Sequence, residues 1–391
     1  MESKRILIII PKLSNGGIER VASNFSMNLD EDYKQIVYSI MHQTDSYPFK
    51  SVPIILNVKL GSNLVNKFIV FIRRLIFLRK LVKNSKPACI ISFGERCNFI
   101  TMLSGVNCKK ILTVHSQISI ENKKKGIYGL VSDLVARITY NNAEKVVAVS
   151  EVVKQDLEKK YKLKNVTRIY NGHDIRFIQE KSNEEISDHD NEFTEFITVG
   201  RITYAKGHWH LIKAISLIKK YKPNVKLRII GAEEEKIFDS LEMLVKKLDL
   251  TENIIFHGHD NEPFKYVSKS KVFVLSSIFE GFPGVVIESL ACGIPIVSSN
   301  SGGATEVILD GCLPQELENT RNYYSEYGAI TPSLPQDFDT SNYIPQEVEH
   351  LARAMMFALE NTYPRKVLLA RAMDYSNENM IECYRNEIEK L

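Results

Sequence analysis

The strongest constraint on the fold of this chain is a repeated alternation of short apolar runs with helical segments. Four runs lie in the first half of the chain, at 5–10, 88–93, 109–116 and 144–150. Five more lie in the second half, at 196–202, 225–232, 253–258, 271–277 and 294–299. A continuous apolar run is typical of a parallel strand that is buried on both faces. Two such series predict an α/β protein with two Rossmann-like, doubly wound domains.

A polar and acidic stretch around residues 180–194 separates the two series. We therefore predict a first domain over residues 1–178 and a second over residues 179–373. The last helical segment, 374–391, is long enough to pack back on the first domain. In open α/β sheets ligands bind beyond the carboxyl ends of the strands, so we expect the two domains to face a central cleft.

The charge of the chain is unevenly divided between its halves. Residues 1–181 carry 30 Lys and Arg against 15 Asp and Glu, whereas the rest carry 21 against 32. This asymmetry indicates that the first domain faces an anionic partner, although a basic surface without a single partner would give the same count. The basic half lacks interleaved aromatic residues and any known nucleic-acid module, which argues against binding to nucleic acid.

One segment, residues 63–86, needs weighing as a membrane element. Arg73, Arg74, Arg79 and Lys80 interrupt it, so its apolar run is too short to span a bilayer. On a helical wheel one face is apolar, consisting of Leu64, Phe68, Phe71, Leu75, Leu78 and Val82. Two interpretations stay open: a helix packed in the core, and a helix lying on an anionic leaflet.

The cysteines and the first residues of the chain indicate the cellular compartment of the protein. The six cysteines show no CxxC spacing and no dense framework, which favours a reducing environment. The first apolar run is short and is followed by Pro11 and Lys12, unlike a signal peptide. We expect a cytoplasmic protein that is peripheral on the inner face of the plasma membrane.

The segment "FEGFPGVVIESLACG" at 279–293 places two carboxylates, Glu280 and Glu288, around a loop that follows a predicted strand. The helix that begins near Gly284 and Val285 offers free N–H groups and the positive end of its dipole to a phosphate. We expect Glu280 on the loop and Glu288 in the first helical turn. Carboxylates accept hydrogen bonds from sugar hydroxyls, although a lone Glu at a helix start often only complements the dipole.

Three further pieces lie after predicted strands. The loop "VGRITYAKG" at 199–207 carries two cations, Arg201 and Lys206, that could neutralise a pyrophosphate. The loop "SNGG" at 14–17 has a bare backbone that can approach a ligand closely. His115 ends the run at 109–116. Each alone would be an ordinary solvated loop or a structural histidine.

Together these pieces resemble the retaining GT-B glycosyltransferases of family four, also called group 1. The family pattern is a Glu, seven residues and a second Glu, matched here by "EGFPGVVIE". Supporting matches are "GGIER" at 16–20, "YNGHD" at 170–174, "GR" with "KG" at 200–207, and "SLACGIPIVSSNSGGATEVI" at 289–308. The resemblance covers about residues 5 to 310.

The resemblance implies a role for each candidate residue. Glu288 would hold the ribose of a nucleotide sugar, and Arg201 and Lys206 with Gly200 its pyrophosphate. Glu280 and His115 would contact the transferred sugar. The backbone of Phe282, Gly284 and Val285 would lie beside that sugar, and Gly16 or Gly17 would approach the phosphate.

Such enzymes move a sugar with retention of configuration and use no protein nucleophile. We expect a hexose or N-acetylhexosamine, UDP-linked, to be transferred to a lipid-linked or cell-surface glycan, with a polyprenyl-linked acceptor as one form. Two alternatives stay open, a nucleotide-sugar-binding scaffold without activity and a nucleotide-sugar epimerase of the same fold.

We expect no metal ion and no cofactor besides the donor. The acidic triplets at 30–32, 188–190 and 337–339 mimic metal motifs but lie in hydrophilic loops away from strand ends. Residues 310–345 depart from the family pattern, with an insertion expected around 312–325. Pro283 removes one N–H from the turn before the second Glu.

Overall fold

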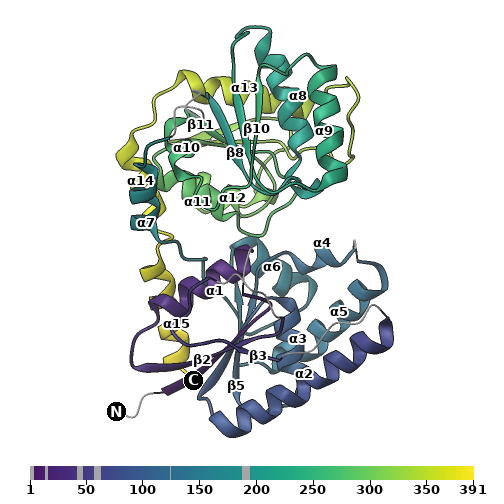
Figure 1. Ribbon diagram of the computed structural model, residues 1–391, viewed down its shortest axis with the longest axis vertical. Helices are drawn as coiled ribbons and strands as arrows, with labels where there is room; N and C mark the ends of the chain where they lie inside the picture. Colours follow the sequence, from purple (N-terminus) through teal and green to yellow (C-terminus); the bar gives the residue numbers. More distant parts are fainter. Residues whose placement is uncertain (1–3, 14–15, 42–46, 57–62, 124, 187–193) are drawn as a thin grey trace. The chain divides into compact units, whose positions relative to one another are not determined.

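A computed structural model of the protein describes residues 4–13, 16–41, 47–56, 63–123, 125–186 and 194–391. The chain forms two compact units (Figure 1): Met1–His173 with Asn377–Leu391, and Asp174–Ser376. The first unit ends five residues before the predicted boundary at 178, because helix α7 (Ile175–Ser182) packs on helices of the second unit. The C-terminal residues from Asn377 belong to the first unit.

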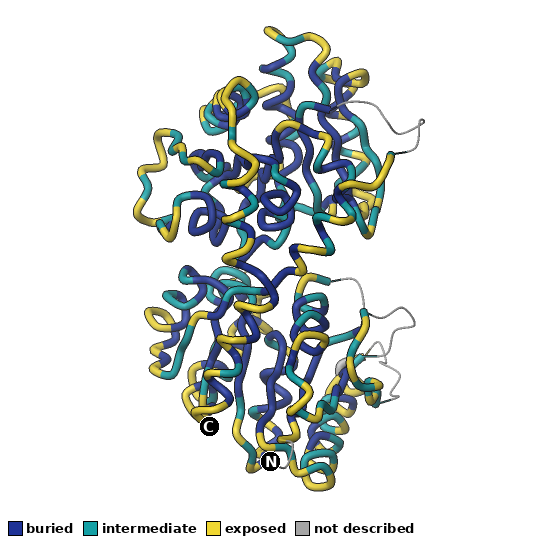
Figure 2. The backbone as a smooth tube through the Cα atoms, turned by 90° about the vertical axis from the view of Figure 1, so that its left-hand side faces the viewer, coloured by how far each residue is buried: buried dark blue, intermediate teal, exposed yellow. Residues whose placement is uncertain are grey.

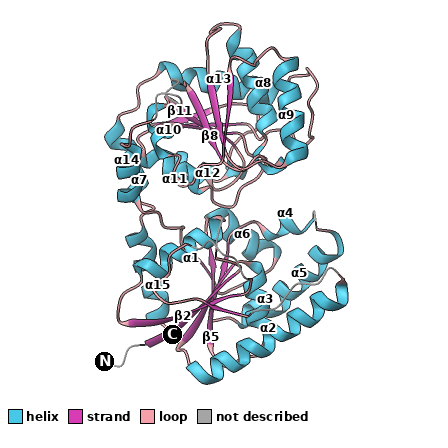
Figure 3. Cartoon of the chain, viewed as in Figure 1, coloured by secondary structure: helices cyan, strands magenta, loops and turns pink. Residues whose placement is uncertain are grey.

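The first unit contains a parallel sheet of seven strands in the order β3-β2-β1-β4-β5-β6-β7. Their bounds are β1 Lys4–Ile10, β2 Tyr33–Ser39, β3 Ile54–Ile55, β4 Cys89–Phe93, β5 Lys109–Val114, β6 Lys145–Ala148 and β7 Val166–Arg168. The helices are α1 Gly17–Asn28, α2 Leu64–Ser85, α3 Glu95–Leu103, α4 Ile118–Lys123, α5 Gly126–Thr139, α6 Glu151–Lys160 and α15 Asn377–Glu389. They lie on both sides of the strands (Figure 3).

Strand β1 shows why the strands in this half of the chain have continuous apolar sequences. Its side chains from Ile6 to Ile10 are all fully buried. Alternate side chains of a strand point to opposite faces, and here both faces are covered. Ile6 and Ile8 pack with Phe25 of α1, whereas Leu7 and Ile9 pack with Leu78 of α2. Burial of one such aliphatic side chain contributes about 1.5–3 kcal/mol, so this strand anchors the unit.

The second unit contains a sheet in the order β10-β9-β8-β11-β12-β14-β13, parallel except for the antiparallel β13–β14 pair. The strands are β8 Phe196–Val199, β9 Leu227–Ile230, β10 Ile254–Gly258, β11 Val272–Leu275, β12 Ile296–Ser299, β13 Tyr323–Ser325 and β14 Gly328–Thr331. The other helices are α8 His208–Lys219, α9 Glu235–Lys247, α10 Phe264–Lys269, α11 Gly284–Ala291, α12 Ala304–Ile308, α13 Gln346–Glu360 and α14 Arg365–Met373. Both units therefore have the predicted doubly wound α/β architecture, with buried strands at the centre of each (Figure 2).

The irregular segment 310–345 contains the antiparallel edge strand. A single helical turn at Pro314–Glu316 precedes β13, which turns directly into β14. The run "GAIT" in β14 is fully buried. Strand β13 therefore forms one edge of the second sheet, whereas the insertion expected around 312–325 stays a prediction.

Helix α2, the segment weighed as a membrane element, is divided between core and solvent. Leu75 and Leu78 are buried in a cluster with β1 and α3, so the helix is part of the core. Phe68, on the same predicted face, is 64% exposed. Among the described residues, no helix combines the length and the apolarity that crossing a bilayer requires.

Candidate functional site

The second sheet has a topological switch point between β8 and β11. From β8 the chain continues to β9 on one side, whereas β11 pairs with β8 on the other and leads to β12. Loops that leave neighbouring strands in opposite directions open a crevice at the carboxyl ends, which is where ligands bind in such folds. The loops after β8 and β11 are those that carry the candidate residues Arg201, Lys206 and Glu280.

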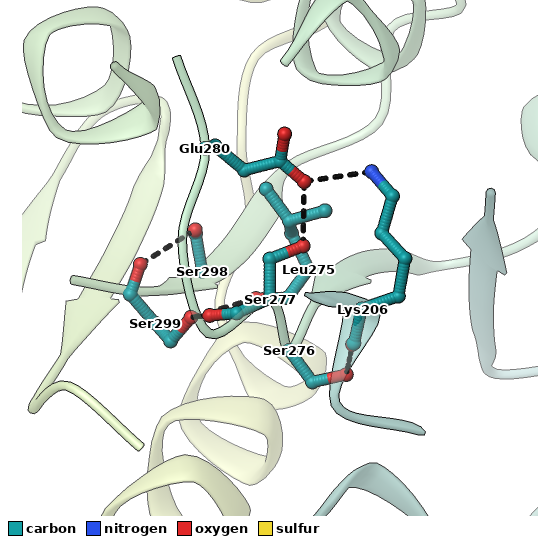
Figure 4. Close-up of polar contacts among 7 residues, drawn as sticks. All are labelled: Lys206, Leu275, Ser276, Ser277, Glu280, Ser298 and Ser299. Atoms are coloured by element: carbon teal, nitrogen blue, oxygen red, sulfur yellow. Dashed lines mark hydrogen bonds and ion pairs between the residues drawn. The ribbon is translucent and has the colours of Figure 1, made fainter. Parts of the chain in front are cut away.

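The structure joins two of these residues directly. Lys206 Nζ lies 2.7 Å from Glu280 Oε1, and Ser277 Oγ donates to the same oxygen at 2.7 Å (Figure 4). The other oxygen of Glu280 points away from both partners in Figure 4. Both side chains of the ion pair are partly buried, with 22% of Lys206 and 16% of Glu280 exposed. The sequence analysis gave these residues separate roles and missed their contact.

A set of backbone contacts fixes the two loops against each other. Ser276 Oγ donates to the carbonyl of Lys206 at 3.0 Å, and the N–H of Ile278 donates to that of Ala205 at 2.8 Å. Gly207 has a φ of 60°, and a Cβ there would lie 2.2 Å from the carbonyl oxygen of Ser276. Only glycine allows this approach without strain. The "KG" of the family pattern therefore positions Lys206.

The other side of the Glu280 loop rests on the loop after β12. The N–H of Glu280 donates to the carbonyl of Ser301 at 2.7 Å. Gly302 has a φ of 138°, and a Cβ there would lie 2.1 Å from the carbonyl oxygen of Glu280. The Gly-Gly pair of "NSGGATEV" thus has a structural reason, because it lets two loops pack by their backbones and holds Glu280 in place.

Helix α11 corrects one expectation. It begins at Gly284 after the N-cap Pro283, so Glu288 is its fifth residue and lies beyond the first turn. The expectation placed Glu288 slightly too early, because a helix that begins at Gly284 rather than Val285 makes Glu288 its fifth residue instead of its fourth. The Glu288 side chain is buried, with 8% exposed. Gly284 and Val285 do form the start of the helix, next to the Glu280 loop.

The remaining candidates of the second unit lie on the same two loops as this pair, after β8 and after β11. Arg201 is exposed on the loop after β8. A Cβ on Gly200 would lie 3.1 Å from Lys206 Cε, so Gly200 leaves room for the Lys206 side chain. The ring of Phe282 is buried and packs 5.6 Å from that of Tyr375, which leaves its backbone as the part that can face a ligand.

In the first unit the switch point lies between β1 and β4. Gly16 is the N-cap of α1, and a Cβ there would lie 2.0 Å from Glu19 Oε2. The buried Glu19 carboxylate therefore covers Gly16, a feature that the sequence analysis overlooked. A Cβ on Gly17 would meet nothing within 4 Å, so packing does not explain that glycine.

His115 follows β5 and is held by a buried polar network. Thr113 Oγ1 donates to the carbonyl of Ser92 at 3.0 Å and lies 2.8 Å from His115 Nε2. Because the single hydroxyl proton of Thr113 is used on Ser92, the His115 ring must donate through Nε2, which leaves Nδ1 as an acceptor. Burial lowers the pKa of His115 to about 4, so the ring is neutral at pH 7.

Glu95 is a further candidate that the sequence analysis missed. It begins α3 directly after Gly94, at the carboxyl end of β4. Tyr140 donates to Glu95 Oε2 at 2.6 Å, and burial raises the pKa of the carboxyl to about 7. A carboxyl with a pKa near neutrality at a strand end is typical of functional sites, but its sequence context, a single Glu after "SFG", gave no signal.

The acidic triplets have structural partners. Asp30 pairs with Arg385 of α15 at 2.7 Å, and Asp339 pairs with the buried Lys213 at 2.9 Å. The triplet at 188–190 lies outside the described residues. Within the described ranges, no group of three or more His, Cys, Asp or Glu side chains is placed to hold a metal ion.

Two sequence families match consecutive parts of the chain. The family described as Glycosyltransferase Family 4 matches residues 15–177, and the family described as Glycosyl transferases group 1 matches residues 178–313. The first match covers α1 and the strands β2 to β7, and the second covers the Lys206–Glu280 site.

Individual relatives agree with these matches. An uncharacterized glycosyltransferase of Methanocaldococcus jannaschii is 31% identical over 340 residues, which covers 81% of this chain and 83% of the relative. The N-acetylgalactosamine-N,N'-diacetylbacillosaminyl-diphospho-undecaprenol 4-alpha-N-acetylgalactosaminyltransferase of Campylobacter jejuni is 28% identical, covering 78% of this chain and 84% of the enzyme. The structure of Anabaena HepE with UDP and glucose superposes with a TM-score of 0.74 at 16% identity, covering 99% of this chain and 100% of HepE.

Proposed function

Because this chain belongs to the group 1 glycosyltransferases of the GT-B fold, we propose that it is a retaining enzyme that transfers a hexose or N-acetylhexosamine from a UDP-sugar. The acceptor in this proposal is a lipid-linked or cell-surface glycan at the cytoplasmic face of the membrane. Two relatives, one from Erwinia amylovora named for amylovoran biosynthesis and one from Staphylococcus aureus named for capsular polysaccharide biosynthesis, support that choice of acceptor.

The observation that carries the proposal is the Lys206–Glu280 pair at the switch point of the second sheet. An ammonium group has three donors, so Lys206 can hold Glu280 with one and a diphosphate with the others. The second oxygen of Glu280 can then accept from a hydroxyl of the transferred sugar. One fixed pair thus serves the anionic and the hydroxylated parts of one donor.

The neighbouring residues complete the donor site in this proposal. Arg201, exposed on the same loop as Lys206, adds a second cation for the diphosphate. The N–H groups at Gly284 and Val285 lie at the start of α11, where the helix dipole favours anions. Glu288 holds the ribose hydroxyls, and Gly200 and the Phe282 backbone line the loops beside them.

The first unit contributes Gly16, Gly17 and His115 in this proposal. His115 supplies Nδ1 as a neutral acceptor for a sugar hydroxyl, a role for which the Thr113 hydroxyl sets the tautomer. The backbone at Gly16 and Gly17 donates to phosphate. The Glu19 carboxylate must leave its place over Gly16 before an anion can approach there, since two negative groups repel.

The reaction proposed for these residues needs no protein nucleophile. The bond from the sugar C1 to the phosphate oxygen breaks while the acceptor oxygen bonds to C1 on the same face. The acceptor proton passes to the departing phosphate oxygen, and Lys206 and Arg201 stabilise the negative charge that develops on the diphosphate. This electrostatic role is the one that a divalent ion fills in other transferases, so we expect a chelator to leave the rate unchanged.

Two similar proteins support the choice of substrates. HepE is seen bound to UDP and glucose, and the Campylobacter relative is named for a diphospho-undecaprenol-linked acceptor. The excess of Lys and Arg in residues 1–181 suits an acceptor that carries a diphosphate or lies in an anionic membrane.

The donor site is tested by thermal unfolding of the purified chain with UDP, GDP, ADP or pyrophosphate. A ligand at about 100 times its Kd adds about 2.7 kcal/mol to the free energy of unfolding. We expect UDP to stabilise the wild type and Arg201→Ala to lose most of that shift. Arg353→Ala, which removes an exposed Arg of α13, is the matched control and should keep the UDP-induced thermal shift. Absence of a shift with every nucleotide would exclude the proposed site.

The reaction is tested by incubating UDP-hexoses and UDP-N-acetylhexosamines with polyprenyl-diphosphate-linked acceptors. Formation of a glycoside with the anomeric configuration of the donor, seen by NMR, supports the proposal, and an inverted product contradicts it. UDP binding without transfer to any acceptor would favour the scaffold, and a changed sugar that is still UDP-linked would identify an epimerase.

A further inference from the structure

Helix α5 has the reverse of the usual polarity for a surface helix. The residues that it buries are small, namely Gly129, Ser132 and Ala136. Its large apolar residues face outward: Ile127 is 82% exposed, Tyr128 54%, Leu130 70%, Val131 53%, Leu134 58% and Ile138 63%. The spacing of these positions along the helix places most of them on one stripe. A contiguous apolar stripe of this kind marks an interaction surface on a soluble domain.

The inward side of α5 is tightly fitted, so the helix cannot simply roll to bury its apolar stripe. A Cβ on Gly129 would lie 2.0 Å from the carbonyl oxygen of Asn122 on α4. Asp133, the single acidic residue of the helix, accepts from Asn122 Nδ2 at 2.6 Å and from the Tyr161 hydroxyl. These contacts fix the rotation of α5 and keep its apolar side chains outward.

The charges on the same layer of the first unit are positive. Helices α5 and α2 both pack on α3. Helix α2 carries six Lys and Arg and no acidic residue. Five of these cations are exposed, Lys67, Arg73, Arg79, Lys80 and Lys83, and they alternate with exposed Val65, Phe68, Ile69 and Ile76. Near α5 the exposed cations among the described residues are Lys123, Lys125 and Arg137, of which Lys125 pairs with Glu121 at 2.7 Å.

From this arrangement we infer that the α5 stripe inserts into an anionic lipid leaflet while the α2 cations contact the headgroups. Apolar side chains flanked by Lys and Arg are the combination that binds such an interface. A second copy of the chain fits less well, since two-fold pairing through this layer would bring two basic α2 surfaces together. The inference rests on the proposed function, which places the acceptor at the cytoplasmic face of the membrane, and deepens it by naming the helix that would bind this membrane.

The test is sedimentation of the purified full chain with vesicles that contain no glycan acceptor. Phosphatidylcholine vesicles with and without phosphatidylglycerol are compared. We expect binding to the anionic vesicles only, weakened by salt because headgroup contacts are screened. Leu130→Gln with Leu134→Gln should lower the vesicle partition coefficient at least about tenfold, since two apolar side chains lose their lipid contacts.

The matched control is Tyr221→Gln with Met243→Gln, which replaces two residues of the second unit that are 84% and 63% exposed. It should bind vesicles like the wild type. A second variant, Arg73→Ser with Lys80→Ser, should lose the preference for anionic lipid while it keeps the α5 stripe.

Equal vesicle binding by the α5 variant and the wild type would overturn the inference. A wild type that does not bind vesicles would also overturn it. If the wild type then forms a concentration-dependent dimer and the α5 variant does not, the α5 stripe is an interface with a second copy of the chain. The UDP-induced thermal shift of each variant is measured in parallel. If the wild type shows the UDP-induced shift but does not bind vesicles, the α5 inference alone is refuted. If the wild type shows no UDP-induced shift, the proposed function is refuted.

Discussion

In the second unit, Lys206 and Glu280 lie on loops after neighbouring strands and form an ion pair at 2.7 Å. In the first unit, by contrast, the His115 ring forms a hydrogen bond with Thr113 at 2.8 Å. The first arrangement is an ion pair with a spare carboxylate oxygen and spare ammonium donors. The second is a neutral ring with one spare acceptor nitrogen. Both lie at the carboxyl ends of parallel strands.

The contrast shows how one fold can serve two kinds of ligand group. A diphosphate needs fixed positive charge, and an ion pair holds its own cation in place before the ligand arrives. In the proposed function a sugar hydroxyl needs an uncharged acceptor of fixed tautomer, which the half-buried His115 with its hydroxyl partner can provide.

The two units should also differ in their dependence on the C-terminal helix. Tyr384 of α15 is buried with its ring 4.9 Å from that of Phe25, in the core of the first unit. Tyr384→Ala should cost about 3–5 kcal/mol of the stability of that unit, because it leaves a cavity. Hydrogen exchange should show lost protection in β1 and α1 but not in β11. Tyr221→Ala, at an exposed site, should change stability by no more than about 0.5 kcal/mol.

Removal of the Glu280 charge should abolish the ion pair on which the second unit depends. Glu280→Gln keeps the shape of the side chain but removes the ion pair with Lys206. We expect kcat to fall about 100- to 1,000-fold, the size of effect that one lost electrostatic contact has in a transition state. Ser277→Ala removes only the hydroxyl contact to Glu280 and should cost much less. Equal effects of both variants would contradict the role given to the charge.

In the first unit, the orientation of the His115 ring depends on Thr113, which acts as a positioning residue. Thr113→Val keeps the volume but cannot accept from His115 Nε2. A lost hydrogen bond of about 1 kcal/mol corresponds to roughly fivefold in kcat/KM. Thr113→Ser should restore the rate, and the UDP-induced thermal shift should not change in either variant. A rate that falls together with the thermal shift would indicate a general structural defect.

The smallest effect concerns pH. Because the folded pKa of His115 is about 4 and its ordinary value is 6.5, the unfolded chain binds a proton between these values that the folded chain does not. The contribution of His115 to stability is therefore lost as pH falls from 6.5 to 4, and its charge should not change above pH 6. NMR titration of the ring should show a midpoint near 4. A midpoint near 6.5 would place the ring in water.

Much of the fold follows from local sequence, and much of the site does not. The run at 5–10 predicts β1 because both faces of that strand are buried, and "SEVVKQDLEKKY" predicts α6 because Ser150 caps it at Val153 N. The two-residue strand β3 has too few residues to give a pattern. The position expected for Glu288 within α11 was wrong by one residue because the start of a helix is not sharply marked in the sequence "PGVVIE".

Contacts that depend on strand order were beyond sequence reasoning. Lys206 and Glu280 are distant in the chain, and they meet because β8 pairs with β11 rather than with β10. The outward face of α5 was missed for a related reason. A helical apolar stripe looks the same whether it faces a core or a membrane, and the small residues opposite it are the sign that the core lies on the other side.

The return of α15 to the first unit has a consequence during synthesis on the ribosome. At roughly 5 to 20 residues per second, the segment Asp174–Ser376 takes about 10 to 40 seconds to be translated. Throughout that interval the nascent first unit lacks the side chains of Met380, Tyr384 and Ile388, so Phe25 and its neighbours stay uncovered. The N-terminal unit is therefore completed last, and the nascent chain presents an apolar surface to chaperones until its final residues emerge.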